Sequence, residues 1–170
     1  MATGHLDPQR VRMVIEFAVR YYRAVVLDVP RMDGALLDAL DVASSIFVVV
    51  NHELTTIRSA FRLAVTLLPR YGGDRLAVLV NRSERHAEIS LADIEKAVNA
   101  RIKHVFPNDY KNALAAVNKG EPFAQSAEGR LAGSFHALAR ELSGQDKGKA
   151  PAAEETSRLF GWLPRRAASE

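Results

Sequence analysis

The sequence predicts an α/β fold in which a parallel sheet lies between two layers of helices. Short apolar runs without polar alternation recur along the chain, which is typical of strands buried on both faces. Segments with apolar residues at helical spacing separate these runs, as in right-handed parallel crossovers. The predicted strands are residues 24–27, 45–50, 76–80 and 103–106. A chain of 170 residues is long enough for one domain with a sizeable core.

Composition excludes several kinds of chemistry. The formal net charge is only +3, which gives little support for a nucleic-acid site. There is no cysteine, so the sequence has no disulfide, thiolate metal site or cysteine nucleophile. The histidines follow no metal-ligand spacing. No apolar run has the length of a membrane span or of a signal peptide core, and we expect a cytoplasmic protein.

The first elements surround a candidate site residue. Asp7 and Pro8 open a helix that we expect to end near Tyr21. The strand at residues 24–27 follows, and Asp28 comes at its carboxyl end, where α/β sheets bind ligands. A cap or turn acid is the simpler interpretation of Asp28. Residues 36–43 form a second predicted helix.

The middle of the chain predicts two further strand–helix units. After the strand at 45–50, a helix opens at Thr55 or Thr56 and runs through Leu68. Its arginines, Arg58 and Arg62, are expected to face outward. The residues expected to face inward are Ile57, Phe61, Ala64, Val65 and Leu68.

The second half continues the alternation. The strand at 76–80 leads into a charged loop at 82–86, and Ser90 with Asp93 predicts a capping box for a helix at 91–98. Pro107 ends the next strand. Asn108 and Asp109 open a helix that stops at Gly120, and a last core helix covers 131–142. We therefore expect an α/β domain at 1–143, a linker at 144–156 and a short apolar and basic tail at 157–170.

Polar residues follow all four predicted strands. Because parallel strands end at one edge of a sheet, these side chains should line a ligand-binding crevice. The alternative is that Asn and Asp simply favour loops. The four residues are Asp28, Asn51, Asn81 and Asn108.

Four motifs in order carry a family resemblance: V-V-L-D-V-P, then I-F-V-V-V-N-H-E-L-x-T-x-R, then V-L-V-N-R, then F-P-N-D-Y-K-x-A-L-x-A-V-N-K-G-x-P. Together they resemble the MinD/ParA group of P-loop ATPases, and within it most closely the pilus-assembly ATPases of the CpaE/TadZ type. The resemblance covers about residues 7–142 and the second half of that ATPase domain. It implies a Rossmann-like three-layer sheet, with ATP and Mg²⁺ as cofactors.

The resemblance implies roles for particular residues. Asp28 matches the Walker B acid, a catalytic carboxylate that holds Mg²⁺ through water. Pro30 and Arg31 would begin the switch-like segment that senses the γ-phosphate. Arg58 matches a family arginine of uncertain role. The residues that match the adenine-side loops are Asn81, Arg82, Pro107, Asn108 and Asp109.

The chain departs from the family in one motif. It contains no G-x-x-x-x-G-K-[ST], and Gly72-Gly73 is followed by Asp74, so it cannot replace the phosphate-binding loop. The amino-terminal receiver-like domain of many members is absent as well. We therefore expect the carboxyl-terminal portion of such an ATPase, not catalytically competent alone. Its partners would be pilus or secretion assembly proteins, and open sheet edges would favour self-association. The alternatives are a fragment of a working MinD/ParA-type ATPase and a generic Rossmann-like binding module.

Two further stretches of the sequence are candidate sites. His52 and Glu53 could be drawn as an acid–base pair, but adjacent loop residues rarely converge and no nucleophile lies beside them. The tail places four large apolar residues near arginines: Leu159, Phe160, Trp162 and Leu163. We expect this tail to fold back on the domain or dock on a partner, with peripheral binding at the inner face of the membrane as the alternative.

Overall fold

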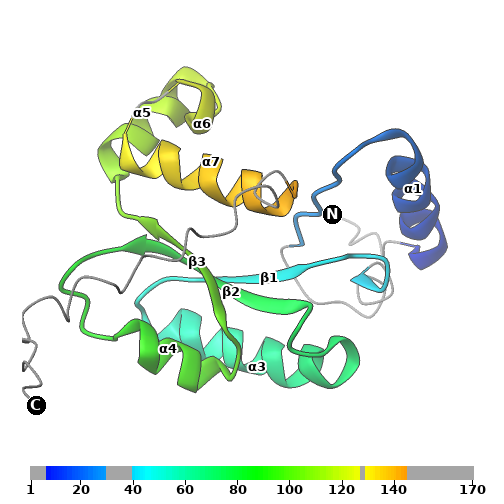
Figure 1. Ribbon diagram of the computed structural model, residues 1–170, viewed down its shortest axis with the longest axis horizontal. Helices are drawn as coiled ribbons and strands as arrows, with labels where there is room; N and C mark the ends of the chain where they lie inside the picture. The colour runs from blue at the N-terminus through cyan, green and yellow to red at the C-terminus, as the bar shows by residue number, and fades with distance from the viewer. Residues whose placement is uncertain (1–6, 30–39, 127–128, 145–170) are drawn as a thin grey trace, which may run out of the picture.

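The fold is a three-stranded parallel sheet with helices on both faces, in a computed structural model that describes residues 7–29, 40–126 and 129–144. The strands are β1 (Ile46–Val50), β2 (Leu76–Ser83) and β3 (Ile102–Pro107), in the order β1-β2-β3. Helices α3 (Leu54–Tyr71) and α4 (Leu91–Val98) cover one face (Figure 1). Helices α5 (Tyr110–Lys119), α6 (Phe123–Ser126) and α7 (Arg130–Leu142) lie on the other side. This arrangement confirms the predicted α/β class with flanking helices.

Local signals placed most helix ends correctly. Helix α1 (Pro8–Tyr21) starts with Asp7, whose side chain accepts a hydrogen bond from the Gln9 amide at 3.0 Å. The predicted capping box of α4 is present in both directions between Ser90 and Asp93. Gly120 ends α5 with φ 69°, a conformation that glycine adopts without steric cost. Helix α3 continues past Pro69 to Tyr71, three residues beyond the expected end at Leu68.

The strand predicted at 24–27 is wrong. These residues run without regular secondary structure, and Val26 is 92% exposed. Apolar, β-branched residues form a strand only where a neighbouring strand supplies hydrogen bonds and packed elements bury the side chains. None of the described segments pairs with residues 24–27, and β1 forms one edge of the sheet. The helix predicted at 36–43 falls largely outside the described residues, apart from its last positions around the buried Leu40.

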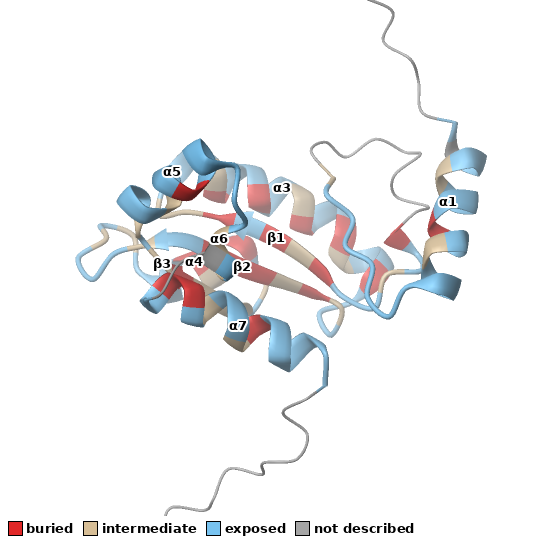
Figure 2. Cartoon of the chain, turned by 90° about the horizontal axis from the view of Figure 1, so that it is seen from above, coloured by how far each residue is buried: buried red, intermediate tan, exposed pale blue. Residues whose placement is uncertain are grey.

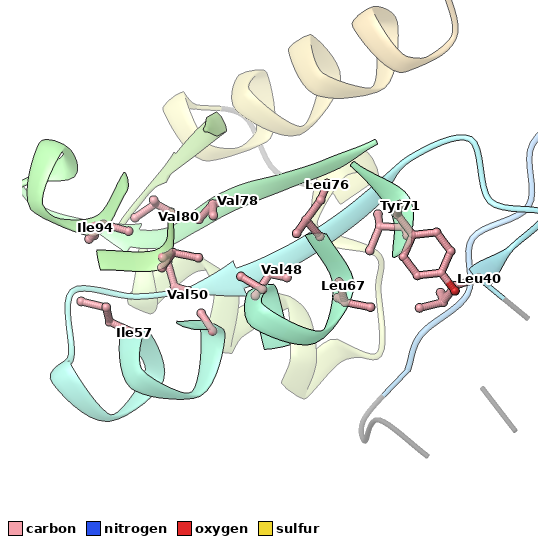
Figure 3. Close-up of a cluster of buried hydrophobic side chains, with 14 residues drawn as sticks. Leu40, Val48, Val50, Ile57, Leu67, Tyr71, Leu76, Val78, Val80 and Ile94 are labelled. Atoms are coloured by element: carbon pink, nitrogen blue, oxygen red, sulfur yellow. The ribbon is translucent and has the colours of Figure 1, made fainter. Parts of the chain in front are cut away.

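The main core lies between the sheet and helices α3 and α4. Alternate residues of the strands point into it, including Val48, Val78 and Val80, and they meet Leu67 of α3 and Ile94 of α4 (Figure 3). A smaller cluster on the opposite face joins the strands to α7. It consists of Leu79, Phe106, Leu131 and Leu138, with Phe47 and Phe123 beside it.

Two side-chain assignments from the sequence are wrong. Phe61 and Val65 of α3 are 47% and 57% exposed, although both were expected to face inward. The buried stripe of α3 is instead Ile57, Ala60, Ala64, Leu67 and Tyr71. Val49 of β1 is 60% exposed, so this strand is not fully buried. On this face of β1, Phe47 packs beside the α7 cluster, whereas Val49 stays exposed.

Candidate functional site

The carboxyl edge of the sheet gathers three of the four predicted polar residues. Strands β1, β2 and β3 are parallel, so their carboxyl ends lie at one edge. Asn51 directly follows β1, Asn81 lies near the end of β2, and Asn108 directly follows β3. Asp28 does not join them by strand position, because its segment is not part of the sheet. The predicted crevice edge is therefore built by three loops.

A β-bulge shapes the end of β2. Val80 lies opposite Val105 and Ser83 opposite Pro107, so β2 carries an extra residue between these pairs. Arg82 takes φ 52°, in the left-handed region that a residue with a side chain rarely adopts. The side-chain oxygen of Asn81 accepts a hydrogen bond from the Arg82 amide at 2.9 Å. Bulges re-aim side chains at sheet edges, and here both Asn81 and Arg82 are exposed to solvent.

The loop after β3 is fixed against the end of β2. The Asn108 amide donates to the carbonyl oxygen of Ser83 at 2.9 Å, and the Asn108 side-chain nitrogen donates to Glu84 at 2.6 Å. Asp109 caps α5, since its carboxylate accepts from the amide of Asn112 at 3.4 Å and from its side chain at 3.0 Å. The structure thus places Asn81, Arg82 and the Pro107–Asp109 loop on neighbouring strand ends.

His52 is a contributor that sequence reasoning missed. Its Nδ1 lies 2.7 Å from the carbonyl oxygen of Ile89, and its Nε2 lies 3.0 Å from the hydroxyl oxygen of Ser83. A carbonyl oxygen can only accept, so Nδ1 donates a hydrogen bond to Ile89. His52 therefore ties the loop after β1 to the loop after β2, and both ring nitrogens are engaged away from Glu53. Its position two residues after the end of β1 was the available signal.

Asn51 holds the other side of the same loop. Its side-chain oxygen accepts from the Thr56 hydroxyl at 2.6 Å and from the Glu53 amide at 3.2 Å. These contacts join the end of β1 to the first turn of α3. The amide oxygen of Asn51 is thus used within the chain. In Asn81 the side-chain oxygen accepts from the Arg82 amide, and the side-chain nitrogen donates to none of the described residues.

An open depression of about 410 Å³ adjoins this edge, between the loop after β2 and the start of α7. Arg85 and Arg130 bring two positive charges to it, and Glu84 brings one negative charge. The remaining lining residues are Ser83, Val105, Pro107 and Ser134. Ser134 is held there by His104, whose Nε2 lies 2.7 Å from its hydroxyl oxygen. A polar, planar ligand would find both hydrogen-bonding groups and an apolar wall at this position.

The described residues do not assemble a magnesium site. Asp28 lies on the exposed segment before residue 30, and within residues 7–29, 40–126 and 129–144 no three His, Asp or Glu side chains come together. Pro30 and Arg31 lie outside the described residues, as do Leu159, Phe160, Trp162 and Leu163. The described residues of the carboxyl edge thus offer hydrogen-bonding groups without a cluster of metal-ligating side chains.

A cluster of charged contacts lies at the opposite, amino end of the sheet. Arg70 binds Asp41 through two hydrogen bonds of 3.1 and 2.8 Å. Arg75 donates to the carbonyl oxygens of Leu40 and Asp41, each at 3.0 Å, and to that of Ala43. The hydrogen bond from Arg70 lowers the pKa of Asp41 below its ordinary value. This cluster fixes the entry to β1, and it takes no part in the candidate site.

The fold defines a class. A ParA family ATPase from Chlorobium tepidum superimposes with a TM-score of 0.71 over 79% of this chain and 57% of its own, at 21% identity. MinD from Pyrococcus horikoshii, solved with Mg-ADP, gives 0.66 over 85% of this chain and 60% of its own, at 20% identity. A MinC:MinD complex from Aquifex aeolicus gives 0.69, at 23% identity, over 96% and 64%. The chain has the fold of P-loop ATPases of the ParA/MinD type.

Sequence similarity narrows the class. The septum site-determining protein MinD of Thermotoga maritima is 24% identical over 148 residues, which is 82% of this chain and 54% of that protein. A protein of Mesostigma viride that carries the MinD name provisionally is 28% identical over 149 residues, 83% of this chain and 51% of its own. No family model matches the sequence. The chain is thus homologous to MinD/ParA-type ATPases and similar to their carboxyl-terminal region, and it spans about half the length of these MinD relatives.

Proposed function

We propose that this chain forms the adenine side of the nucleotide site in a MinD/ParA-type ATPase. One observation carries the proposal: the β2 bulge sets Asn81 and Arg82 beside the loop Pro107, Asn108 and Asp109, at the carboxyl edge of a ParA/MinD-like sheet. An amide side chain suits a base edge because it offers both a donor and an acceptor. The chain then works as one portion of a larger ATPase rather than as a separate binding module.

Each residue of the proposed site has its own role. Asn81 recognises the base edge, the Arg82 backbone turn presents it, and Pro107 supplies an apolar surface beside the base. ATP brings the transferable phosphoryl group when bound, with Mg²⁺ as its counter-ion. By resemblance, Asp28 would hold that ion through water, and Pro30 with Arg31 would sense the γ-phosphate. These two roles depend on a phosphate-binding loop, which the 170 residues do not contain.

The test compares adenosine, ADP and ATP by NMR on the ¹⁵N-labelled chain. If only the base side is present, the three ligands should bind with dissociation constants within about threefold of each other, in the millimolar range. Amide shifts should concentrate at residues 81–83, 108 and 109, and Asn81→Ala should remove them. Micromolar ATP binding with measurable turnover by the chain alone would contradict the proposal, and so would shifts confined to other residues.

A narrower assignment concerns the branch of the family. The four-motif series favours the CpaE/TadZ pilus-assembly type, with pilus or secretion proteins as partners. The named relatives are MinD proteins, so the broader MinD/ParA assignment has the stronger support. Upstream genomic sequence in the same frame decides between a separate gene product and a portion of a complete ATPase, because a glycine-rich phosphate loop encoded there would identify the latter.

A further inference from the structure

His52 closes the charged loop between β2 and α4. Its Nε2 contacts the hydroxyl of Ser83, where the loop starts, and its Nδ1 contacts the carbonyl oxygen of Ile89, near the end of the loop. Residues 84–88 between these contacts are mostly exposed, whereas residues 76–80 of β2 are buried or half-buried (Figure 2). Both partners of His52 belong to this chain, so neither contact depends on cover from another segment. One side chain from the loop after β1 thus fixes both ends of a different loop.

Ser83 is where the three loops at the carboxyl edge of the sheet meet. Its hydroxyl contacts His52 of the loop after β1, and its carbonyl oxygen accepts from the Asn108 amide of the loop after β3 at 2.9 Å. Ser83 also directly follows Arg82 in the β2 bulge. Ile89 is held independently, because its side chain packs against the main core. The end of the charged loop is therefore fixed by packing as well, and its start by the hydrogen bonds of Ser83.

The residue before Ser83 needs such support. Arg82 has φ 52°, and a residue with a Cβ atom keeps this left-handed conformation only where its surroundings hold it. On one side, the side-chain oxygen of Asn81 accepts from the Arg82 amide at 2.9 Å. On the other side, His52 and Asn108 hold Ser83. Removal of His52 takes away one of these two contacts, and the turn is then freer to relax.

We propose that His52 is a positioning residue for base recognition. Through Ser83 it holds Arg82 in the left-handed conformation, and that turn presents Asn81 at the edge of the sheet. This role rests on the proposed adenine-side function of Asn81 and Arg82. His52 itself touches no ligand in this scheme, because both of its ring nitrogens are engaged by Ser83 and Ile89.

Two amide substitutions separate the contacts of His52. The side-chain nitrogen of Asn takes the place of Nδ1, so His52→Asn keeps the hydrogen bond to Ile89 and loses the contact with Ser83. The longer Gln side chain reaches the place of Nε2, so His52→Gln keeps the contact with Ser83 and loses the one with Ile89. Because an amide group both donates and accepts, His52→Gln serves in either direction of the hydrogen bond with the Ser83 hydroxyl.

The first readout is the exchange of the Arg82 amide hydrogen with water, measured by NMR on the ¹⁵N-labelled full chain without ligand. Exchange should be about tenfold faster in His52→Ala and His52→Asn, the scale of one hydrogen bond, and within about twofold of wild type in His52→Gln. His136→Ala is the matched control, because this exposed histidine contacts Ala124 and should leave Arg82 unchanged. Far-UV circular dichroism verifies that each variant is folded, and the two amide variants decide the result if His52→Ala is not.

The second readout is the dissociation constant of adenosine, measured from amide shifts. His52→Asn should weaken binding about fivefold, and His52→Gln should stay within about twofold of wild type. In an Arg82→Gly background, His52→Asn should have no further effect, because glycine adopts positive φ without steric cost. This suppression would not be seen if His52 acted on binding by another route.

Equal changes at the Arg82 amide in His52→Asn and His52→Gln, or no change in either, overturn the proposal and leave His52 as a structural tie of the loop. Wild-type binding of adenosine that His52→Asn leaves unchanged refutes only the role of His52. A wild-type chain that binds no adenosine refutes the adenine-side function and this role with it. The two failures are therefore distinguished by the wild-type titration alone.

Discussion

At the scale of single residues, the polar contacts of this protein divide between two ends of one sheet. At the carboxyl end, Asn81, His52 and Asn108 fix the loops around the nucleotide site that we propose. At the amino end, Arg70 and Arg75 hold Asp41 and the backbone before β1. Both arginines also lie over the Tyr71 ring, with guanidinium carbons 5.5 and 5.1 Å from its centroid. Substitutions at the amino end should therefore change stability without changing ligand binding.

Arg75→Ala should lower the free energy of unfolding by about 1.5–3 kcal/mol, the range for hydrogen bonds that involve a charged group. The guanidinium of Arg75 satisfies carbonyl oxygens of Leu40, Asp41 and Ala43, which would be left without it. Urea denaturation followed by circular dichroism measures the change. Arg101→Ala is the matched control, because Arg101 is exposed and should change stability by less than about 0.5 kcal/mol. Equal effects of the two substitutions would show that the Arg75 contacts contribute nothing.

Asp41 should make stability depend on pH in the acid range. Its pKa is lowered in the folded state by the hydrogen bond from Arg70, with a smaller contribution from Tyr71, against an unfolded value of about 3.9. A depressed folded pKa stabilises the protein above the unfolded pKa, and that stabilisation is lost as the pH falls through the folded pKa. The stability difference between wild type and Asp41→Asn should be constant above about pH 5 and shrink below about pH 4. A difference that does not change down to pH 2.5 would refute this linkage.

At the scale of elements, the segment at residues 24–28 shows that apolar, β-branched composition alone does not make a strand. Its sequence has the β-branched centre of a buried strand, and the structure leaves it unpaired and largely exposed. Its amide hydrogens should exchange with solvent at least 100-fold faster than those of β2, which is hydrogen-bonded on both sides to β1 and β3. Hydrogen exchange followed by NMR resolves the two segments. Protection of residues 24–28 comparable to β2 would indicate a strand partner.

At the scale of the whole molecule, one side of the sheet is open. Among the described residues, strand β1 pairs only with β2; it contains no charge or proline, and it exposes Val49. Natural edge strands are normally protected by charge, proline or a bulge. We predict concentration-dependent self-association that added nucleotide does not alter, and Val49→Lys should shift the equilibrium toward monomer. Sedimentation velocity over a hundredfold concentration range measures it, and a monomer at every concentration would contradict the prediction.

The tail gives a second prediction at this scale. None of the described helices has the length and hydropathy to cross a membrane. The residues Leu159, Phe160, Trp162 and Leu163 lie outside the described part of the chain, so the two hypotheses for them stay open. If the tail docks on protein, the full chain and a chain ending at Gln145 should float equally with anionic vesicles. Flotation of the full chain alone, lost with Trp162→Ala, would instead establish peripheral membrane binding.

The sequence by itself determined the α/β class, three of the strands and most helix ends. These depend on local causes: apolar runs, the caps at Asp7 and Ser90, and the stop at Gly120. It also placed Asn51, Asn81 and Asn108 at one edge of the sheet, because parallel strands must end at a common edge. Each of these features is encoded within a few residues of where it appears.

Only the tertiary structure decided which apolar residues are buried. Residues 24–27 and the stripe of Phe61 and Val65 have the composition of buried elements, yet burial needs a neighbour, and neighbours come from distant parts of the chain. The same reason hid the role of His52, whose partners Ser83 and Ile89 lie 31 and 37 residues away. The β2 bulge depends on pairing with β3, so it too has no local signature. Local composition thus identifies candidate core and site residues. Contacts between distant parts of the chain decide which of these residues are buried or brought together.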